Sequence, residues 1–183
     1  MSLMEKTATP VGSYAPDFEL PGIDNEVHHL ARYLETYMAV GVIFMCNHCP
    51  YVRLYLDRLK QIQDEFQAQS FTLIGINSND ASKYPEDSFE NMKTFAANAG
   101  LNFPYLWDSN QDVAYSFDAA KTPEVFLLDN GGVIRYSGGI DDNPQSPEAV
   151  QVQYLRDAIA HLLNGEAISQ TWTNTIGCSV KWR

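Results

Sequence analysis

The sequence predicts an α/β sandwich, in which helices cover both faces of a mixed central sheet. Two apolar runs, at residues 38–45 and 71–77, have no polar face, which is typical of strands buried on both sides. Helical patterns follow each run, so these strands are expected to be parallel and joined by right-handed crossovers. Residues 124–138 predict two antiparallel strands around Asn130-Gly131, a dipeptide that favours a two-residue hairpin turn.

The remaining elements follow from local patterns. Residues 14–30 alternate apolar and polar side chains around Phe18 and Leu20, which predicts a short N-terminal strand or hairpin. Residues 50–68 carry apolar side chains at helical spacing, and residues 88–100 predict a helix between a serine cap and a glycine. Three further segments are expected: an extended piece at 102–108, a short helix at 110–120, and a helix at 146–165 that opens with Ser-Pro.

Composition narrows the class of protein. With 45% hydrophobic residues in 183, the chain is expected to form a single domain over residues 1–183. The N-terminus, residues 1–10, is expected to be flexible, and the tail, residues 166–183, to pack on the domain. The net charge of −11 argues against nucleic acid and an anionic membrane as partners, because both need clustered lysine and arginine. The N-terminus does not resemble a signal peptide, so a cytoplasmic location is expected.

Chemistry is expected at residues 46–49, Cys-Asn-His-Cys, where a buried strand ends and a helix begins. The positive end of a helix dipole favours an anion there, so a thiol loses its proton more easily. In a reducing compartment such a pair is catalytic or metal-binding rather than a structural staple. A third cysteine, Cys178, makes the count odd, which also argues against a disulfide framework.

Pro50 should be the first helical residue, which places Cys49 at the N-cap and Cys46 on the loop before it. Cys46 is therefore expected to be the more exposed sulfur and the attacking thiolate, with Cys49 as the resolving thiol. The reverse order stays open, because a cysteine at the N-cap is also well placed to be ionised. Asn47, His48 and Pro50 are expected to tune the pair, and His48 either stabilises a thiolate or faces solvent.

Several stretches resemble a known family. Residues 11–30 are similar to the first strands of the redoxins, residues 40–52 to their strand and active-site helix, and residues 121–138 to their cis-proline turn and following hairpin. Over residues 11–163 the chain resembles the thioredoxin fold, and within it the redoxin group that includes the peroxiredoxins, the AhpC/TSA family. The final GCSVKWR is also similar to the tail of peroxiredoxin-like proteins that carry a thioredoxin-type C-x-x-C.

The resemblance implies a thioredoxin-like three-layer sandwich with an N-terminal strand extension. It also implies that Thr122 and Pro123 bind substrate, because in such proteins the residue before a cis-proline lines the disulfide site and its backbone meets an extended substrate. The peroxiredoxin pattern is incomplete. If Cys49 is the aligned cysteine, Cys46 and Val42 stand where that family has threonine and proline.

The function expected first is a thiol-disulfide oxidoreductase that uses a Cys46/Cys49 dithiol. It would need no metal or organic cofactor, but would need a reductase as external electron donor; its partner would be a protein or small-molecule disulfide. The sequence leaves the oligomeric state open, and the resemblance to redoxins, which often pair, favours a homodimer. The alternatives are a peroxiredoxin-like hydroperoxide reductase with antioxidant activity and a copper- or zinc-binding protein that uses the cysteines with a histidine.

Two other segments bear on the site. The tail contains Trp172 and Trp182 and is expected to fold back, so Cys178 is either a third thiol near the pair or a buried, unreactive cysteine. Residues 78–90 are expected to form a loop that flanks the site. Their acidic side chains are equally consistent with a solvated loop and a helix cap.

Overall fold

A five-stranded mixed sheet forms the centre of the protein in the computed structural model, which describes residues 9–183. The strand order is β5-β4-β3-β7-β8, with β3 parallel to β4 and β4 to β5, while β7 and β8 are antiparallel additions. The predicted mixed sheet is confirmed. Its strands are β3 (Ala39–Phe44), β4 (Phe71–Asn77), β5 (Tyr105–Trp107), β7 (Glu124–Asp129) and β8 (Ile134–Gly138).

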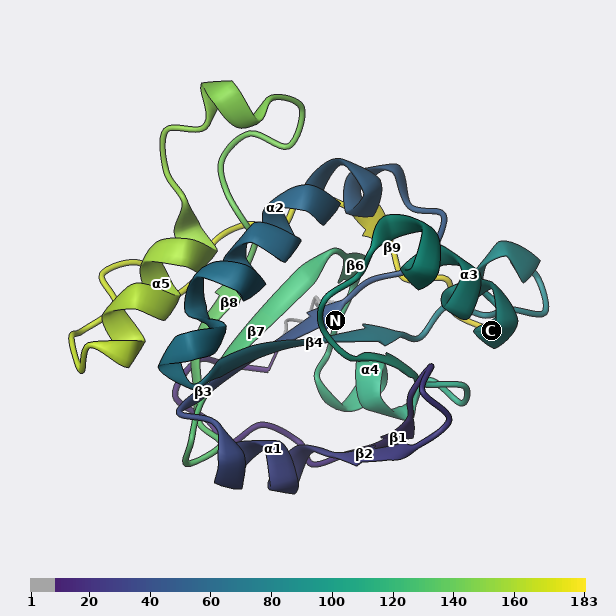
Figure 1. Cartoon of the computed structure of the whole chain (residues 1–183), viewed down its shortest axis with the longest axis horizontal. Helices are drawn as coiled ribbons and strands as arrows, with labels where there is room; N and C mark the ends of the chain where they lie inside the picture. Colours follow the sequence, from purple (N-terminus) through teal and green to yellow (C-terminus); the bar gives the residue numbers. More distant parts are fainter. Residues whose placement is uncertain (1–8) are drawn as a thin grey trace, which may run out of the picture.

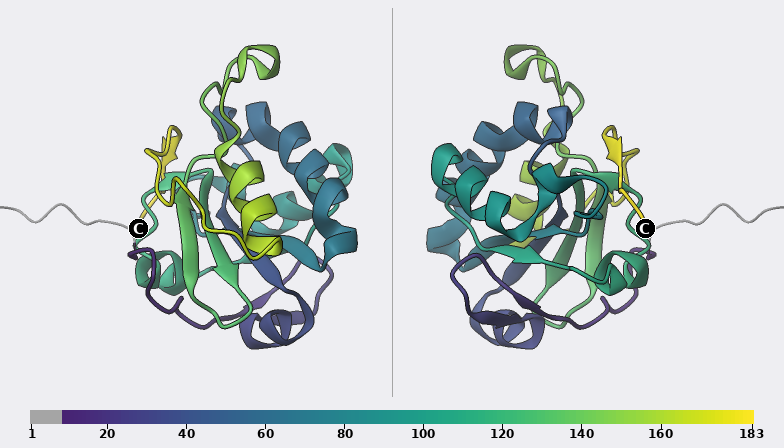
Figure 2. Two further views of the ribbon diagram at one scale, coloured as in Figure 1. Left: turned by 90° about the vertical axis from the view of Figure 1, so that its left-hand side faces the viewer. Right: turned by 90° about the vertical axis from the view of Figure 1, so that its right-hand side faces the viewer.

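Helices cover both faces of the sheet, as Figures 1 and 2 show. Alternate side chains of β3 point to opposite faces, so Ile43 packs in one buried apolar cluster and Val42 in the other. The first face carries α2 (Pro50–Phe66), α3 (Phe89–Ala99) and α5 (Tyr154–Leu163). The second carries α1 (Leu30–Thr36), α4 (Asp112–Ser116) and an N-terminal hairpin of β1 (Glu19–Pro21) and β2 (Val27–His29). These layers make the predicted sandwich.

The turn between β7 and β8 differs from the prediction. Asp129 and Val133 are paired, since the Asp129 amide donates to the Val133 carbonyl at 3.0 Å, so the loop holds three residues rather than two. Gly132 closes it with φ of 81°, a left-handed conformation that glycine adopts without strain. The Asp129 side chain accepts from the amides of Gly131 and Val133, each at 3.0 Å, which favours the longer loop.

The helix predicted for residues 146–165 is also interrupted. Residues Pro147–Ala149 form one 3-10 turn, and α5 begins only at Tyr154. The Asp142 carboxylate accepts hydrogen bonds from the amides of Gln151 and Val152, at 3.0 and 3.2 Å, and so removes them from a helical ladder. The excursion between β8 and α5 consequently projects above the sheet, at the top of Figure 1.

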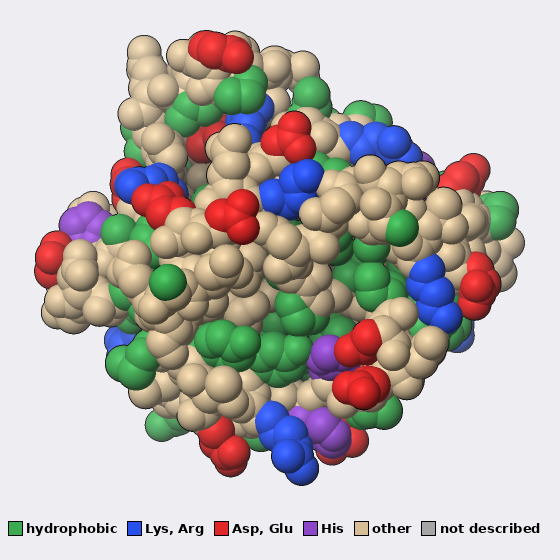
Figure 3. Space-filling model, viewed as in Figure 1, with side chains coloured by type: hydrophobic (Ala, Val, Ile, Leu, Met, Phe, Trp, Pro, Cys, Tyr) green, Lys and Arg blue, Asp and Glu red, His purple; other side chains and the backbone are tan. Residues whose placement is uncertain are grey.

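The C-terminal tail crosses the end of the sheet beside the start of α2. Its short strand β9 (Cys178–Ser179) pairs antiparallel with β6 (Lys121–Thr122), next to the cis peptide bond between Thr122 and Pro123 (Figure 1). Of the residues predicted to be flexible, 1–8 lie outside the described part of the chain. Across residues 9–183, the structure contains no helix with the length and apolar character needed to span a bilayer. On the face drawn in Figure 3, basic side chains are scattered among acidic ones.

Candidate active site

The two cysteines of the C-x-x-C segment lie between the end of β3 and the start of α2. Pro50 is the first helical residue and Cys49 is the N-cap, with extended backbone angles of −64° and 123°, as predicted. The expected difference in exposure is wrong. The side chains of Cys46 and Cys49 are each only 1% exposed, because the tail and the 78–90 loop close over them.

Thr122 lies against both sulfurs, and its position agrees with the resemblance. Its hydroxyl is 3.8 Å from the Cys46 sulfur, and its carbonyl oxygen is 3.4 Å from the Cys49 sulfur, which can donate to it only when Cys49 is protonated. The peptide bond that follows, to Pro123, is cis. The segment predicted to bind substrate therefore contacts the cysteine pair directly.

Cys178 joins the site from the far end of the sequence. Its sulfur is 2.6 Å from the Cys49 sulfur, and its side chain is half-buried. Antiparallel pairing with Thr122 sets this position, because strand register places Cys178 directly opposite Thr122. Cys178 was expected to be either a third thiol near the pair or a buried, unreactive cysteine. Its position beside Cys49 favours the first hypothesis.

The pKa values of the three thiols diverge. A hydrogen bond from Cys46 lowers the pKa of Cys49 to about 4 against the opposing effect of burial, and bonds from Cys178, Thr122 and the Val52 amide lower it further. The same hydrogen bond to Cys49, together with burial and the charge of Asp87, raises the pKa of Cys46. Burial, followed by the contact with Cys49, raises the pKa of Cys178 to about 11. The preferred thiolate is therefore Cys49, with a protonated thiol on each side.

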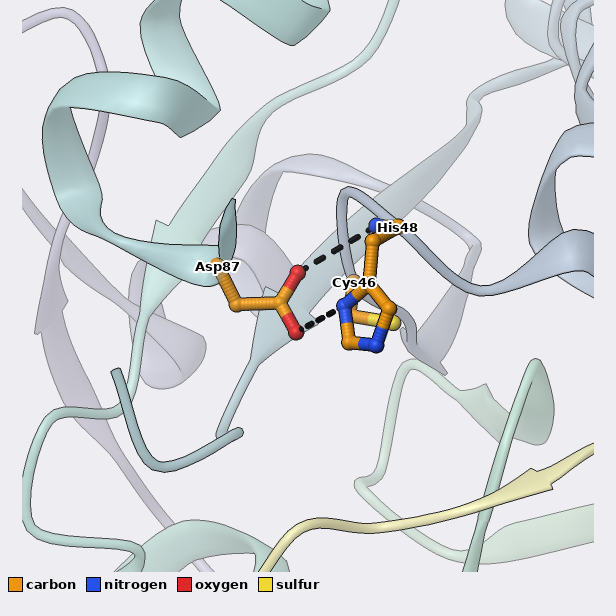
Figure 4. Close-up of side chains that lie close together, drawn as sticks. All are labelled: Cys46, His48 and Asp87. Atoms are coloured by element: carbon orange, nitrogen blue, oxygen red, sulfur yellow. Dashed lines mark hydrogen bonds and ion pairs between the residues drawn. The ribbon is translucent and has the colours of Figure 1, made fainter. Parts of the chain in front are cut away.

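A buried carboxylate, which the sequence did not single out, holds the loop between the cysteines. Asp87 is fully buried at the end of the Pro85–Asp87 turn, and one of its oxygens accepts from the amides of Asn47 and His48, at 2.8 and 3.3 Å. Its other oxygen accepts from the Asn79 side chain at 2.9 Å and contacts the His48 ring at 2.5 Å (Figure 4). The 78–90 loop does flank the site, as predicted, but its Asp87 side chain is buried rather than solvated.

Asn47 and His48 each make a second contact that fixes the loop. The Asn47 side chain is 4% exposed, donates to the Glu86 carbonyl at 2.9 Å and accepts from the Tyr105 hydroxyl at 2.8 Å. The His48 ring stacks on Tyr84, with ring centres 5.9 Å apart. Both residues border the pair as predicted, and their tuning of it stays a prediction.

The described residues contain one group of three side chains that could ligate a metal ion: Cys46, His48 and Asp87, whose donor atoms lie within 4.8 Å of one another (Figure 4). A structural zinc site takes four ligands, with thiols ionised and carboxylates free to coordinate. Here both Asp87 oxygens already accept hydrogen bonds, and Cys46 is the thiol whose pKa is raised. The group fits a hydrogen-bonded support for the loop better than a metal centre.

The chain is similar to several known proteins. The chain is similar to thiol-disulfide oxidoreductase ResA of Geobacillus thermodenitrificans (strain NG80-2), with 29% identity over 136 residues that cover 72% of this chain and 70% of that protein. A solved structure of a hypothetical protein from Sinorhizobium meliloti 1021 matches with a TM-score of 0.90 and 34% identity over 97% of each chain. The solved structure of an uncharacterized conserved protein from Geobacillus kaustophilus matches with a TM-score of 0.88 and 37% identity, over 95% of this chain and 93% of that one.

The fold itself is thioredoxin-like. The thioredoxin domain of a thiol-disulfide oxidoreductase from Bacteroides vulgatus superimposes with a TM-score of 0.62 at 17% identity, over 86% of this chain and 96% of that one. The AhpC/TSA family matches residues 11–137, which include the C-x-x-C segment, Thr122 and Pro123. The chain therefore belongs to the AhpC/TSA family.

Proposed function

We propose that the protein is a thiol-disulfide oxidoreductase in which Cys49 is the attacking thiolate and Cys46 the resolving thiol. The observation that carries this proposal is the position of Cys49 at the N-cap of α2, where its sulfur lies 2.6 Å from the Cys178 sulfur and 3.4 Å from the Thr122 carbonyl oxygen. A thiolate attacks a disulfide fastest when it is ionised at the working pH, and a helix N-terminus favours the ion. This order is the alternative that the sequence left open.

The reaction has two thiol-disulfide exchanges. The Cys49 thiolate attacks one sulfur of a substrate disulfide, so that a mixed disulfide forms and the second substrate sulfur leaves as a thiolate. The Cys46 thiol then loses its proton and attacks the Cys49 sulfur, which releases the first substrate sulfur and closes a Cys46–Cys49 disulfide. The His48 ring, within 4.8 Å of the Cys46 sulfur, is placed to accept that proton. An external reductase restores both thiols, and no metal or organic cofactor takes part.

A protein disulfide is the substrate class that the surface next to the site favours. Leu54, in the second turn of α2, is exposed, and it lines a shallow, mainly apolar hollow together with Pro50, Tyr51, Arg53 and Gln145. Exposed apolar surface beside a reactive centre is typical of contact with another polypeptide. The cytoplasmic location and the homodimer stay predictions.

Single-turnover reduction of insulin disulfides tests the proposal. We expect Cys49→Ser to abolish turnover. Cys46→Ser, combined with Cys178→Ser so that no other thiol lies beside Cys49, should stop at a covalent mixed disulfide that mass spectrometry detects. If Cys49→Ser instead accumulates the mixed disulfide, the order is the one first expected from the sequence. Wild-type turnover in both variants would overturn the assignment altogether.

Hydroperoxide reduction is a second candidate, supported by membership in the AhpC/TSA family and by the low pKa of Cys49. The Cys49 thiolate would attack a peroxide oxygen to give a sulfenic acid and an alcohol, and a neighbouring thiol would then displace water to form a disulfide. Peroxiredoxins usually carry an arginine that helps to activate peroxide near the strand after the cis-proline, where this chain has Lys121 and Glu124. Glu124 is buried and accepts from the Ala120 and Lys121 amides, which argues against strong peroxidase activity. Stopped-flow measurement of the reaction with an alkyl hydroperoxide tests this second function. A rate no greater than that of free cysteine would exclude hydroperoxide reduction.

A further inference from the structure

The chain's own C-terminal strand occupies the edge at which an extended disulfide substrate would be expected to pair. Thr122 lies opposite Cys178 and Lys121 opposite Ser179, and the Val180 amide donates to the Ala120 carbonyl at 2.9 Å. Strand addition of this kind uses main-chain hydrogen bonds for affinity and places alternate side chains in pockets. Cys178 is the side chain that this pairing presents to Cys49, at 2.6 Å between sulfurs.

Contacts on both sides of Cys178 hold the strand in place. After it, the Lys181 amide donates to the Asn79 side chain at 2.9 Å, and the Lys181 carbonyl accepts from the Asp80 amide at 2.8 Å. Before it, Gly177 passes so close to Thr122 that a Cβ there would lie 2.2 Å from the Thr122 carbonyl oxygen. The close approach therefore depends on glycine at position 177.

The three thiols differ in how far they are from solvent. Cys46 and Cys49 are 1% exposed, whereas Cys178 is half-buried, so it is the thiol of the three nearest the surface. A reductant that approaches from solvent would meet Cys178 before the inner pair. A sulfur–sulfur bond of about 2.05 Å needs only a small further approach of Cys178 and Cys49.

We propose that strand β9 is a built-in substrate strand, and that Cys178 exchanges disulfides with Cys49 as the outermost of three thiols. This rests on the proposed function, which supplies the Cys46–Cys49 disulfide. The Cys178 thiolate attacks the Cys49 sulfur, the Cys49–Cys178 bond forms, the Cys46–Cys49 bond breaks, and its electron pair leaves on Cys46. The proton lost by Cys178 is balanced by the one that Cys46 takes up, so the exchange is redox-neutral. It moves the disulfide to the surface, where an external reductase can reach it.

Disulfide mapping of variants tests the exchange. Reduced protein is treated with one equivalent of diamide, quenched with acid, alkylated and digested without reduction. We expect wild type to contain both Cys46–Cys49 and Cys49–Cys178 peptides, Cys46→Ser to contain only Cys49–Cys178, and Cys178→Ser only Cys46–Cys49. Cys49→Ser should contain neither. If Cys46→Ser keeps both remaining thiols free while Cys178→Ser closes its bridge, this inference is wrong and the proposed function stands.

If neither variant forms a bridge to Cys49, both proposals are wrong. A second comparison tests the strand itself without removing a thiol. In the Cys46→Ser background, Gly177→Ala should slow formation of the Cys49–Cys178 bridge at least tenfold, because the added methyl group displaces the strand from Thr122. Ser179→Ala, at an exposed neighbour, is the matched control and should leave the rate unchanged. Equal rates in the two variants would contradict the role of the paired strand.

Discussion

Cys49 has a thiol on each side, and the two are supported differently. The inner thiol, Cys46, lies on a loop whose amides bind the buried carboxylate of Asp87. The outer thiol, Cys178, lies on a two-residue strand at the surface, whose approach depends on backbone pairing with Thr122. The buried, firmly held Cys46 suits repeated closure of one disulfide with Cys49. The half-buried Cys178 suits disulfide exchange with other molecules. The following predictions test this difference, from the largest expected effect to the smallest.

The largest effect on stability is expected at Asp87, which holds the loop that carries Cys46. Asp87→Asn replaces an acceptor of several hydrogen bonds with an amide that directs N–H groups at other donors. Loss of hydrogen bonds to a buried charged group costs about 3 kcal/mol, so we expect the free energy of unfolding to fall by about that amount. Urea denaturation of the reduced protein measures it.

The adjacent acid provides the control for this experiment. Glu86 is exposed, so Glu86→Gln should change the free energy of unfolding by less than about 0.5 kcal/mol. Equal stability of the two variants would show that Asp87 does not support the loop.

The next effect is on the acidity of Cys49. Cys46→Ala removes the hydrogen bond that contributes most to the low pKa of Cys49. A hydrogen bond to a charged group is worth about 1.5–3 kcal/mol, and one pKa unit about 1.4 kcal/mol, so the pKa should rise by about 1–2 units. Titration of the thiolate absorbance in the ultraviolet measures the change.

Removal of the outer thiol should have the smaller effect. Cys178→Ala removes a donor that is half-buried, so water replaces part of its hydrogen bond to Cys49. We expect the pKa of Cys49 to rise by less than about 1 unit. A rise as large as that in Cys46→Ala would remove the distinction between the two neighbours.

The surroundings of Cys49 within the C-x-x-C segment could be predicted from the sequence, whereas the contact between Cys49 and Cys178 could not. The strand before it, the helix start at Pro50 and the N-cap position of Cys49 follow from apolar runs and proline geometry, which act over a few residues. The approach of Cys178 depends on pairing between segments far apart in the chain, and residues 166–183 carry no periodic pattern.

Burial was the other property that the sequence did not reveal. Asp87 follows Glu86 in an acidic stretch, and local pattern does not distinguish the exposed acid from the buried one. Cys46 is covered by segments from other parts of the chain, so its position on a loop misled the expectation of exposure. The helix break before α5 depends on the Asp142 carboxylate, which lies nine residues before Gln151 and accepts from the Gln151 and Val152 amides.

Thiolate titration of the fully reduced protein tests the central claim, that Cys49 is ionised between two protonated thiols. Because its pKa is lowered, the Cys49 thiolate should persist as pH falls and disappear only near pH 4, whereas an ordinary thiol is protonated below about 8.5. We predict one thiolate per chain at neutral pH in wild type, Cys46→Ser and Cys178→Ser, and none in Cys49→Ser. A neutral-pH thiolate that survives in Cys49→Ser, or none in wild type, would contradict the account.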